Sequence, residues 1–220
     1  MWNFLKLYAV WDGVVGPKTY ISSFPMFILL AVSVILIGLI GERFIAYFRR
    51  REPDANRIVK ETLTHLREGD VEGALKRLGD QDTPIRNVLR VGLQNAELPP
   101  EEVEKLMYAR ILNEKDRLTQ RLTPISVISV LAPLLGLFGT VDGLIHAFHE
   151  IAVTGTGGPE VVGEGISTSL VATWTGLIIA VLAVIFFNVF NRYVDVLISR
   201  IEAAVQEFLV ILKEYQATRG

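Results

Sequence analysis

Hydroxyl side chains are the groups that could do chemistry in two long apolar stretches of this chain. The stretches 122–141 and 165–191 contain no Asp, Glu, Lys, Arg or His. The second carries a small, weakly polar stripe at helical spacing: Ser169, Thr173, Gly176, Ala180 and Ala183, with Thr168 and Thr175 beside it. Thr140 lies in the first stretch. Hydroxyls can hold water or ions but do not titrate near neutral pH, so a titrating group for ion movement must come from another subunit.

The same residues also have a structural interpretation. Ser and Thr at this density commonly pack helices, and Thr140 can bond back to a carbonyl of its own helix instead of lining a path. Gly139 and Gly143 are one turn apart, the spacing of small residues that lets membrane helices approach closely. The residues expected to pack helices are Pro133, Gly136, Gly139, Gly143, Ser169 and Gly176.

A small group of acidic and imidazole side chains follows the first of these stretches directly. Asp142 is followed on one helical face by His146 and His149, with Glu150 near. Their donor types suit a metal, but they lie at an exposed helix end, so we expect no metal and a solvated Asp142. The other interpretation of Asp142 is that it gathers cations at the outer mouth of a path.

No motif in the sequence supports an enzyme. It contains no P-loop, nucleophile elbow or carboxylate dyad, and zero cysteines exclude thiolate nucleophiles and disulfides. A net charge of −2 gives no case for nucleic acid. We therefore expect neither a cofactor nor catalysis.

The elements that must position the hydroxyls are membrane helices. Of the 220 residues, 50% are hydrophobic and 21% charged, and the charges are segregated. Residues 19–41 are a third uncharged stretch, and each of the three reaches the roughly 20 residues that cross a bilayer. The sequence predicts transmembrane helices over 19–41, 122–149 and 165–191 and excludes an ordinary soluble domain.

Basic residues predict the orientation of these spans. Residues 42–121 hold sixteen of the 22 Lys and Arg, whereas 142–164 hold none. The pattern places the N-terminus and a loop over 150–164 on the outer side of the membrane, and 42–121 and 192–220 on the inner side. A cleaved signal peptide fits poorly, because the first apolar stretch is long and its basic cluster follows it. The tryptophans in residues 1–18 favour an interfacial helix.

The cytoplasmic parts also have the pattern of helices. Short amphipathic helices are expected after Pro53, up to Gly79 and from Pro84, and a long helix from Pro100 to about His149. Residues 192–220 continue the third span with an apolar stripe. The fold class is therefore an all-α membrane protein with three transmembrane helices, two of them extended into a cytoplasmic helical bundle. Because one chain offers few partners for these stripes, we expect a homo-oligomer.

Two motifs resemble a known family. Gly-Leu-Phe-Gly-Thr-Val at 136–141, after Ala132-Pro133, resembles the second-span signature of the ExbB/TolQ/MotA proton-channel family. The run Gly-Ile-Ser at 165–167, with Leu170, Ala172-Thr173, Gly176-Leu177 and then Asn-Val-Phe at 188–190, resembles its third-span signature. The three-span plan is similar to ExbB and TolQ rather than to four-span MotA.

The resemblance implies a pentamer of this chain around the single membrane helices of two ExbD- or TolR-like partners in the bacterial inner membrane. A partner Asp would be the titrating group, with Thr140 and Thr173 lining its path. The complex would turn ion-motive force into work on a TonB- or TolA-like protein, for outer-membrane transport or envelope maintenance.

Three positions depart from the family pattern. Thr168 stands where ExbB and TolQ usually carry an acidic residue, Leu182 where the family often has a proline, and Asp142 where an apolar or aromatic residue is common. The choice between H⁺ and Na⁺ stays open. The alternative function is a passive membrane scaffold that anchors a partner complex without conducting ions.

Overall fold

The computed structural model of the chain describes residues 24–49, 55–155 and 159–218. Of these residues, 92% are helical and none lies in a strand. In chain order the elements are α2 (Phe24–Arg49), α3 (Ala55–Arg67), α4 (Val71–Leu78), α5 (Pro84–Gln94), α6 (Pro100–Thr119), the 3₁₀ turn η1 (Gln120–Leu122), α7 (Thr123–Thr154) and α8 (Pro159–Ala217). The all-α prediction is confirmed. The prediction for residues 1–18 lies outside the described residues.

Within the described residues, three stretches are long and apolar enough to cross a membrane: Phe24–Tyr47, Pro100–Val153 and Gly165–Ala217. Each contains one of the three predicted spans, apart from residues 19–23, which are not described. By its contacts the chain forms two compact units, Met1–Gly41 with Pro124–Phe187, and Glu42–Thr123 with Asn188–Gly220. We call these the first and the second unit.

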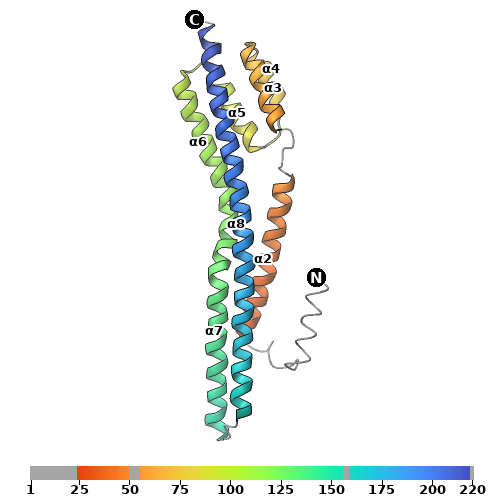
Figure 1. The fold of residues 1–220 in the computed structure, drawn as a ribbon, viewed down its shortest axis with the longest axis vertical. Helices are drawn as coiled ribbons and strands as arrows, with labels where there is room; N and C mark the ends of the chain where they lie inside the picture. Colours follow the sequence, from red (N-terminus) through yellow and green to blue (C-terminus); the bar gives the residue numbers. More distant parts are fainter. Residues whose placement is uncertain (1–23, 50–54, 156–158, 219–220) are drawn as a thin grey trace. The chain divides into compact units, whose positions relative to one another are not determined.

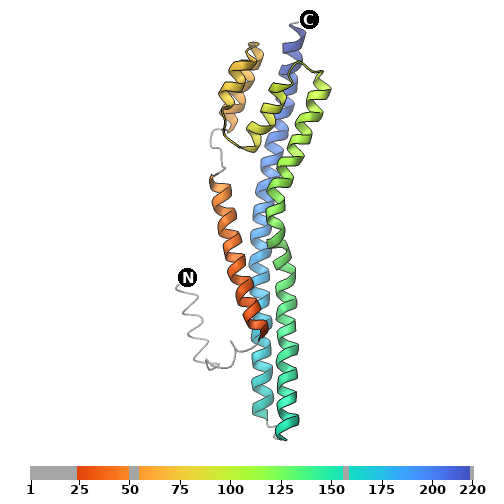
Figure 2. The ribbon, with the colours of Figure 1, turned by 180° about the vertical axis from the view of Figure 1, so that it is seen from behind.

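The first unit contains almost all of α7 and the most apolar parts of α2 and α8. In Figures 1 and 2, α7 and α8 run side by side as an antiparallel pair, with α2 along them. Most of their large side chains are exposed, Phe27, Leu134 and Val181 among them, as expected for helices that face lipid. The buried residues include five alanines beside a few large side chains such as Leu29, Leu36 and Ile125, and the alanines allow close backbone approach between helices: Ala132, Ala147, Ala172, Ala180 and Ala183.

The second unit is a helical bundle with an ordinary apolar core. The helices α3 and α4 pack on each other, as do α5 and α6. Asp70 caps α4 by accepting a hydrogen bond from the Gly73 N–H (2.8 Å), and Gly69 and Gly79 take positive φ at the turns on either side of α4. At Gly92 the approach is close enough that an added Cβ would lie 2.7 Å from Met107 Sδ and 2.9 Å from Phe208 Cε1.

The C-terminal part of α8 completes this core. Its buried stripe is Val194, Ile198, Ile201, Val205, Phe208 and Leu212. Gln216 Nε2 donates to the carbonyls of Ala96 and Leu98, both at 2.8 Å, which ties the last turn of α8 to the α5–α6 connection. The α8 stripe is therefore covered by helices of its own chain (Figure 2) and does not by itself require a second copy, while the homo-oligomer stays a prediction.

One of the two remaining expectations is confirmed and the other is wrong. The helix from Pro100 continues to Val153 as one long helical stretch, as expected. At Gln120–Leu122 it tightens into a 3₁₀ turn, because Pro124 has no N–H to donate to the Gln120 carbonyl, which instead accepts from the Thr123 N–H. The loop expected over 150–164 is too long. The helix α7 continues to Thr154 and α8 begins at Pro159, a residue suited to the first helical turn.

Glu61 provides a pH test of the second unit. It accepts a hydrogen bond from Arg57 Nε at 2.7 Å and another from Arg77 Nε of α4. The hydrogen bond from Arg57, and then that from Arg77, lowers the pKa of this carboxyl below its ordinary value of 4.5. The stabilisation that these hydrogen bonds give the folded chain is therefore present above pH 4.5 and is lost as the pH falls through the lowered pKa.

We expect Glu61→Gln to reduce the stability of the chain at pH 7. The difference in stability from the wild type should narrow below about pH 4, as measured by thermal unfolding at a series of pH values. A difference that stays constant with pH would contradict the assignment.

Candidate functional site

A seam of small residues joins α7 to α8. An added Cβ on Gly136 would lie 3.0 Å from the Ala172 carbonyl oxygen, and one on Gly176 would lie 2.5 Å from the Ala132 carbonyl oxygen. An added Cβ on Gly139 would lie 2.6 Å from Ala172 Cβ. Further along, Gly143 meets Ser169 and Gly165 meets Ala147. Since backbone atoms cannot move aside as a flexible side chain can, the seam admits no larger residue at these glycines.

The seam places Thr173 against the backbone of α7. Its Oγ1 donates to the Gly136 carbonyl at 3.1 Å, the hydroxyl contact that crosses between α7 and α8 in the described residues. Gly136 has no side chain to block this approach. Thr173 is half-buried, and its oxygen keeps acceptor capacity for water or an ion after donating its proton.

Three further hydroxyls of α7 and α8 bond within their own helices. Thr140 Oγ1 donates to the Leu137 carbonyl at 2.7 Å and Thr175 Oγ1 to the Val171 carbonyl at 2.9 Å. Ser169, which is buried, donates to the Gly165 carbonyl at 2.7 Å. Thr140 therefore has the back-bonded geometry that the sequence left open, and its oxygen can still accept a hydrogen bond. Thr168 lies in the helical backbone of α8, and its side chain is outside the description.

Thr140 and Thr173 both lie near Gly136. Thr140 follows Gly136 by one helical turn on α7, so it lies on the same face as the carbonyl to which Thr173 bonds. Pro133, inside α7, precedes Gly136 by three residues and also lies near this face. The structure thus gathers Thr140, Thr173, Gly136 and Gly139 around one segment of the seam.

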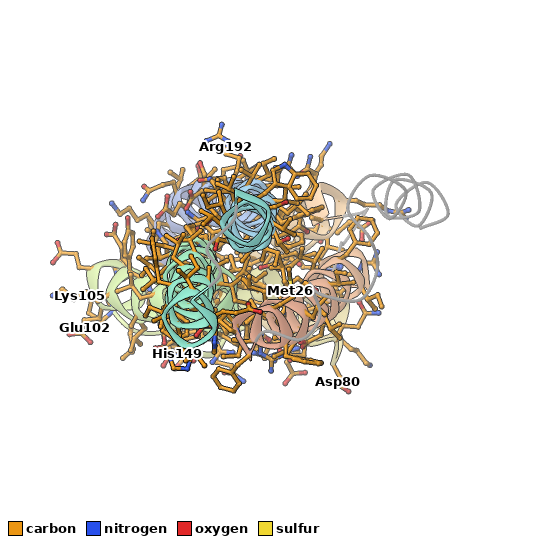
Figure 3. The ribbon with its side chains drawn as sticks, turned by 90° about the horizontal axis from the view of Figure 1, so that it is seen from below. Met26, Asp80, Glu102, Lys105, His149 and Arg192 are labelled. Atoms are coloured by element: carbon orange, nitrogen blue, oxygen red, sulfur yellow. The ribbon has the colours of Figure 1, made fainter. Side chains whose placement is uncertain are left out.

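Asp142 lies one turn before His146 on α7. His146 Nε2 is 3.8 Å from Asp142 Oδ1, and the Asp142 side chain is 28% exposed against 76% for His146. In Figure 3, which looks along the helices, His149 lies at the outside of α7. Within the described ranges no three His, Asp or Glu side chains are close enough together to hold a metal.

Sequence reasoning named Ala132 and Ala172 only as parts of the family motifs and did not name Ala147, whereas all three contact glycines of the seam. The signal was available: Ala132, Gly136, Gly139, Gly143 and Ala147 repeat at spacings of three and four residues. Two polar clusters of the second unit were also missed, one around Arg43 and one around Glu114. They combine residues far apart in sequence, so no local spacing identifies them.

A known protein family matches the part of the chain that contains these residues. The model of the MotA/TolQ/ExbB proton channel family matches residues 80–203, which include the whole seam. The biopolymer transport protein ExbB of Neisseria meningitidis is 28% identical over 201 residues, covering 84% of this chain and 89% of that protein. The Tol-Pal system protein TolQ of Pseudomonas aeruginosa is 31% identical over 144 residues, covering 60% and 62%.

A solved structure is similar in fold. The flagellar MotAB stator complex of Bacillus subtilis contains a chain that superposes with a TM-score of 0.62 and 20% sequence identity, covering 96% of this chain and 88% of that one. At this identity the similarity concerns the fold alone.

Proposed function

Since this chain belongs to the MotA/TolQ/ExbB proton channel family, we propose that it conducts ions together with an ExbD- or TolR-like partner. Proton-channel-type energy transduction in a membrane is what its family and relatives indicate. The finer proposal is a pentamer around two single-span partner helices, which passes mechanical work to a TonB- or TolA-like protein. No cofactor and no catalytic residue take part in this function.

The observation that carries the proposal is the contrast between hydroxyls and titratable groups. The uncharged stretches 122–141 and 165–191 offer Thr140, Thr173 and Thr175 as oxygen ligands but no group that binds and releases a proton. A carboxylate on a partner helix supplies that group. Thr168 joins the proposed path by its position on α8, and Asp142 stands at its outer mouth.

The proposed orientation follows from the basic residues. With sixteen Lys and Arg, residues 42–121 lie in the cytoplasm together with 192–220, and the α7–α8 turn lies in the periplasm. The spans are then 19–41, 122–149 and 165–191 of the bacterial inner membrane. Residues 1–18 rest on its outer surface.

Thr173→Val tests the ion path directly. Valine keeps the shape of threonine but removes the oxygen, so we expect ion flux through the complex to fall by about tenfold or more, as when a charged species loses a hydrogen-bond partner. The measurement is proton and sodium flux into vesicles containing the chain and its co-purified partner. Thr173→Ser restores the oxygen and should restore most of the flux.

Ser129→Ala is the matched control, because Ser129 donates only to the Ser126 carbonyl of its own helix at 2.7 Å. It should leave flux unchanged, and all three variants should retain the partner on purification. Undiminished flux in Thr173→Val would overturn the role of this hydroxyl. A passive scaffold predicts instead that the energised function survives an ionophore that collapses the gradient.

A further inference from the structure

Two buried hydrogen-bond donors lie near the charged end of α2 without an acceptor. The Arg43 side chain is 4% exposed, and Tyr47, one turn later on the same helix face, is also buried. Among the described residues neither Arg43 Nε nor Tyr47 Oη has a hydrogen-bond partner. A buried donor normally finds an acceptor, so this pair needs an explanation.

The charges around the two donors do not balance. Arg43 pairs with the neighbouring Glu42, and Arg121 Nη1 lies 3.8 Å from the same carboxylate oxygen. One carboxylate thus faces two guanidinium groups, and Glu42 is itself 58% exposed. The sequence adds the arginines of 49–51 directly after this point. The group that completes the cluster must therefore be an anion with acceptor oxygens.

The surroundings favour an amphiphilic anion over a free one. The uncharged stretch of the first span ends at Gly41, so Arg43 and Tyr47 fall at the depth of the headgroups. The Tyr47 ring packs against Phe190 and Tyr193 of α8, with centroid distances of 5.5 and 5.0 Å. An apolar wall beside paired donors matches a phospholipid, which presents acyl chains and a phosphate together.

We propose that Arg43 and Tyr47 form a binding site for the phosphate of an anionic phospholipid, with Arg121 at its rim. The Arg43 guanidinium donates from its Nε edge and Tyr47 from its hydroxyl. Since Arg43 is held by an exposed carboxylate and its own side chain is long, it turns toward the headgroup without repacking the helices. In the orientation proposed above, the lipid belongs to the cytoplasmic leaflet, and the site exists whether or not the chain conducts ions.

The test uses the full-length chain, purified in detergent and depleted of lipid, and titrated with phosphatidylglycerol, phosphatidylcholine or inorganic phosphate. Thermal unfolding reports binding, and native mass spectrometry counts retained lipids. We expect phosphatidylglycerol to raise the melting temperature and phosphatidylcholine or inorganic phosphate to have little effect. Arg43→Gln and Tyr47→Phe should each weaken phosphatidylglycerol binding by about tenfold.

Tyr47→Phe tests the site without disturbing the fold. It removes only a hydroxyl that has no partner among the described residues, so without lipid its stability should equal or exceed that of the wild type. Arg192→Gln is the matched control, since Arg192 is an exposed arginine on α8 that points away from the helices (Figure 3). It should bind lipid as the wild type does.

Three outcomes would overturn the proposal. Equal responses to phosphatidylglycerol and phosphatidylcholine would remove the anion preference. Stabilisation by inorganic phosphate with no further gain from lipid would assign the site to a soluble anion. Unchanged lipid binding in Tyr47→Phe, combined with loss of the oligomer, would mean that a carboxylate of a second copy completes the cluster.

Discussion

Replacing Gly176 by leucine will separate α7 from α8 and destabilise the chain by about 3 kcal/mol or more. An added Cβ at Gly176 would lie 2.5 Å from the Ala132 carbonyl oxygen and 3.1 Å from Gly136 Cα, so the two backbones must move apart before any side chain fits. Overpacking of this kind typically costs about 1–3 kcal/mol even for single methylene groups. Loss of the Thr173 to Gly136 hydrogen bond adds to it.

Gly38→Leu is the matched control for this substitution. Gly38 lies in α2, is exposed, and has no atom within 4 Å of an added Cβ. The same change of residue should therefore be neutral or stabilising there, since leucine is the better helix former by roughly 0.5–1 kcal/mol. Unfolding of the purified chains in mixed detergent micelles measures both. Similar stabilities for the two variants would contradict the close packing of the seam.

Replacing Arg110 by methionine should cost about 3 kcal/mol, because it leaves a buried carboxylate without its charge partner. The Glu114 side chain is 2% exposed, and its Oε1 accepts from Arg110 Nη2 at 2.7 Å and from Asn87 Nδ2 at 2.9 Å. Arg117 lies 3.8 Å from the other oxygen, which offsets part of the loss. Methionine keeps most of the arginine's apolar volume, so the effect reports charge rather than packing.

Replacing the other partner of the pair, Glu114, should cost far less stability. Glu114→Leu removes the buried charge itself, and the partly exposed Arg110 then turns to water while Asn87 keeps its 2.8 Å hydrogen bond to Asp82. The double variant Arg110→Met with Glu114→Leu should recover most of the stability lost in Arg110→Met. Thermal unfolding of the four chains completes the cycle. A larger cost for Glu114→Leu than for Arg110→Met would show that the carboxylate is a net stabiliser rather than a buried liability.

The helices were largely predictable because their signals are local. Pro84 and Pro100 sit in the first turns of α5 and α6, as their fixed φ favours, and Gly79 follows α4. The uncharged stretches predicted the three spans by length alone. The end of α7 at Thr154 and the start of α8 at Pro159 were missed, because glycine-rich sequence resembles a loop even where a helix forms.

The candidate site was predictable only in part. Thr173 and Gly136 were each singled out by residue type, but the hydrogen bond between them depends on the register of two helices, which no single-helix periodicity determines. The same holds for the stripe of α8 from Val194 to Leu212. Periodicity predicted its apolar face, yet which chain covers that face depends on how α5 and α6 fold back.

The glycine seam has a mechanical consequence for α7 and α8. With Gly136 against Ala172, Gly139 against the same alanine and Gly176 against Ala132, neither helix can slide or rotate on the other without first lifting its backbone out of contact. The pair therefore moves as one rigid rod. Any displacement of one helix within the seam therefore carries the other with it, without slippage between them.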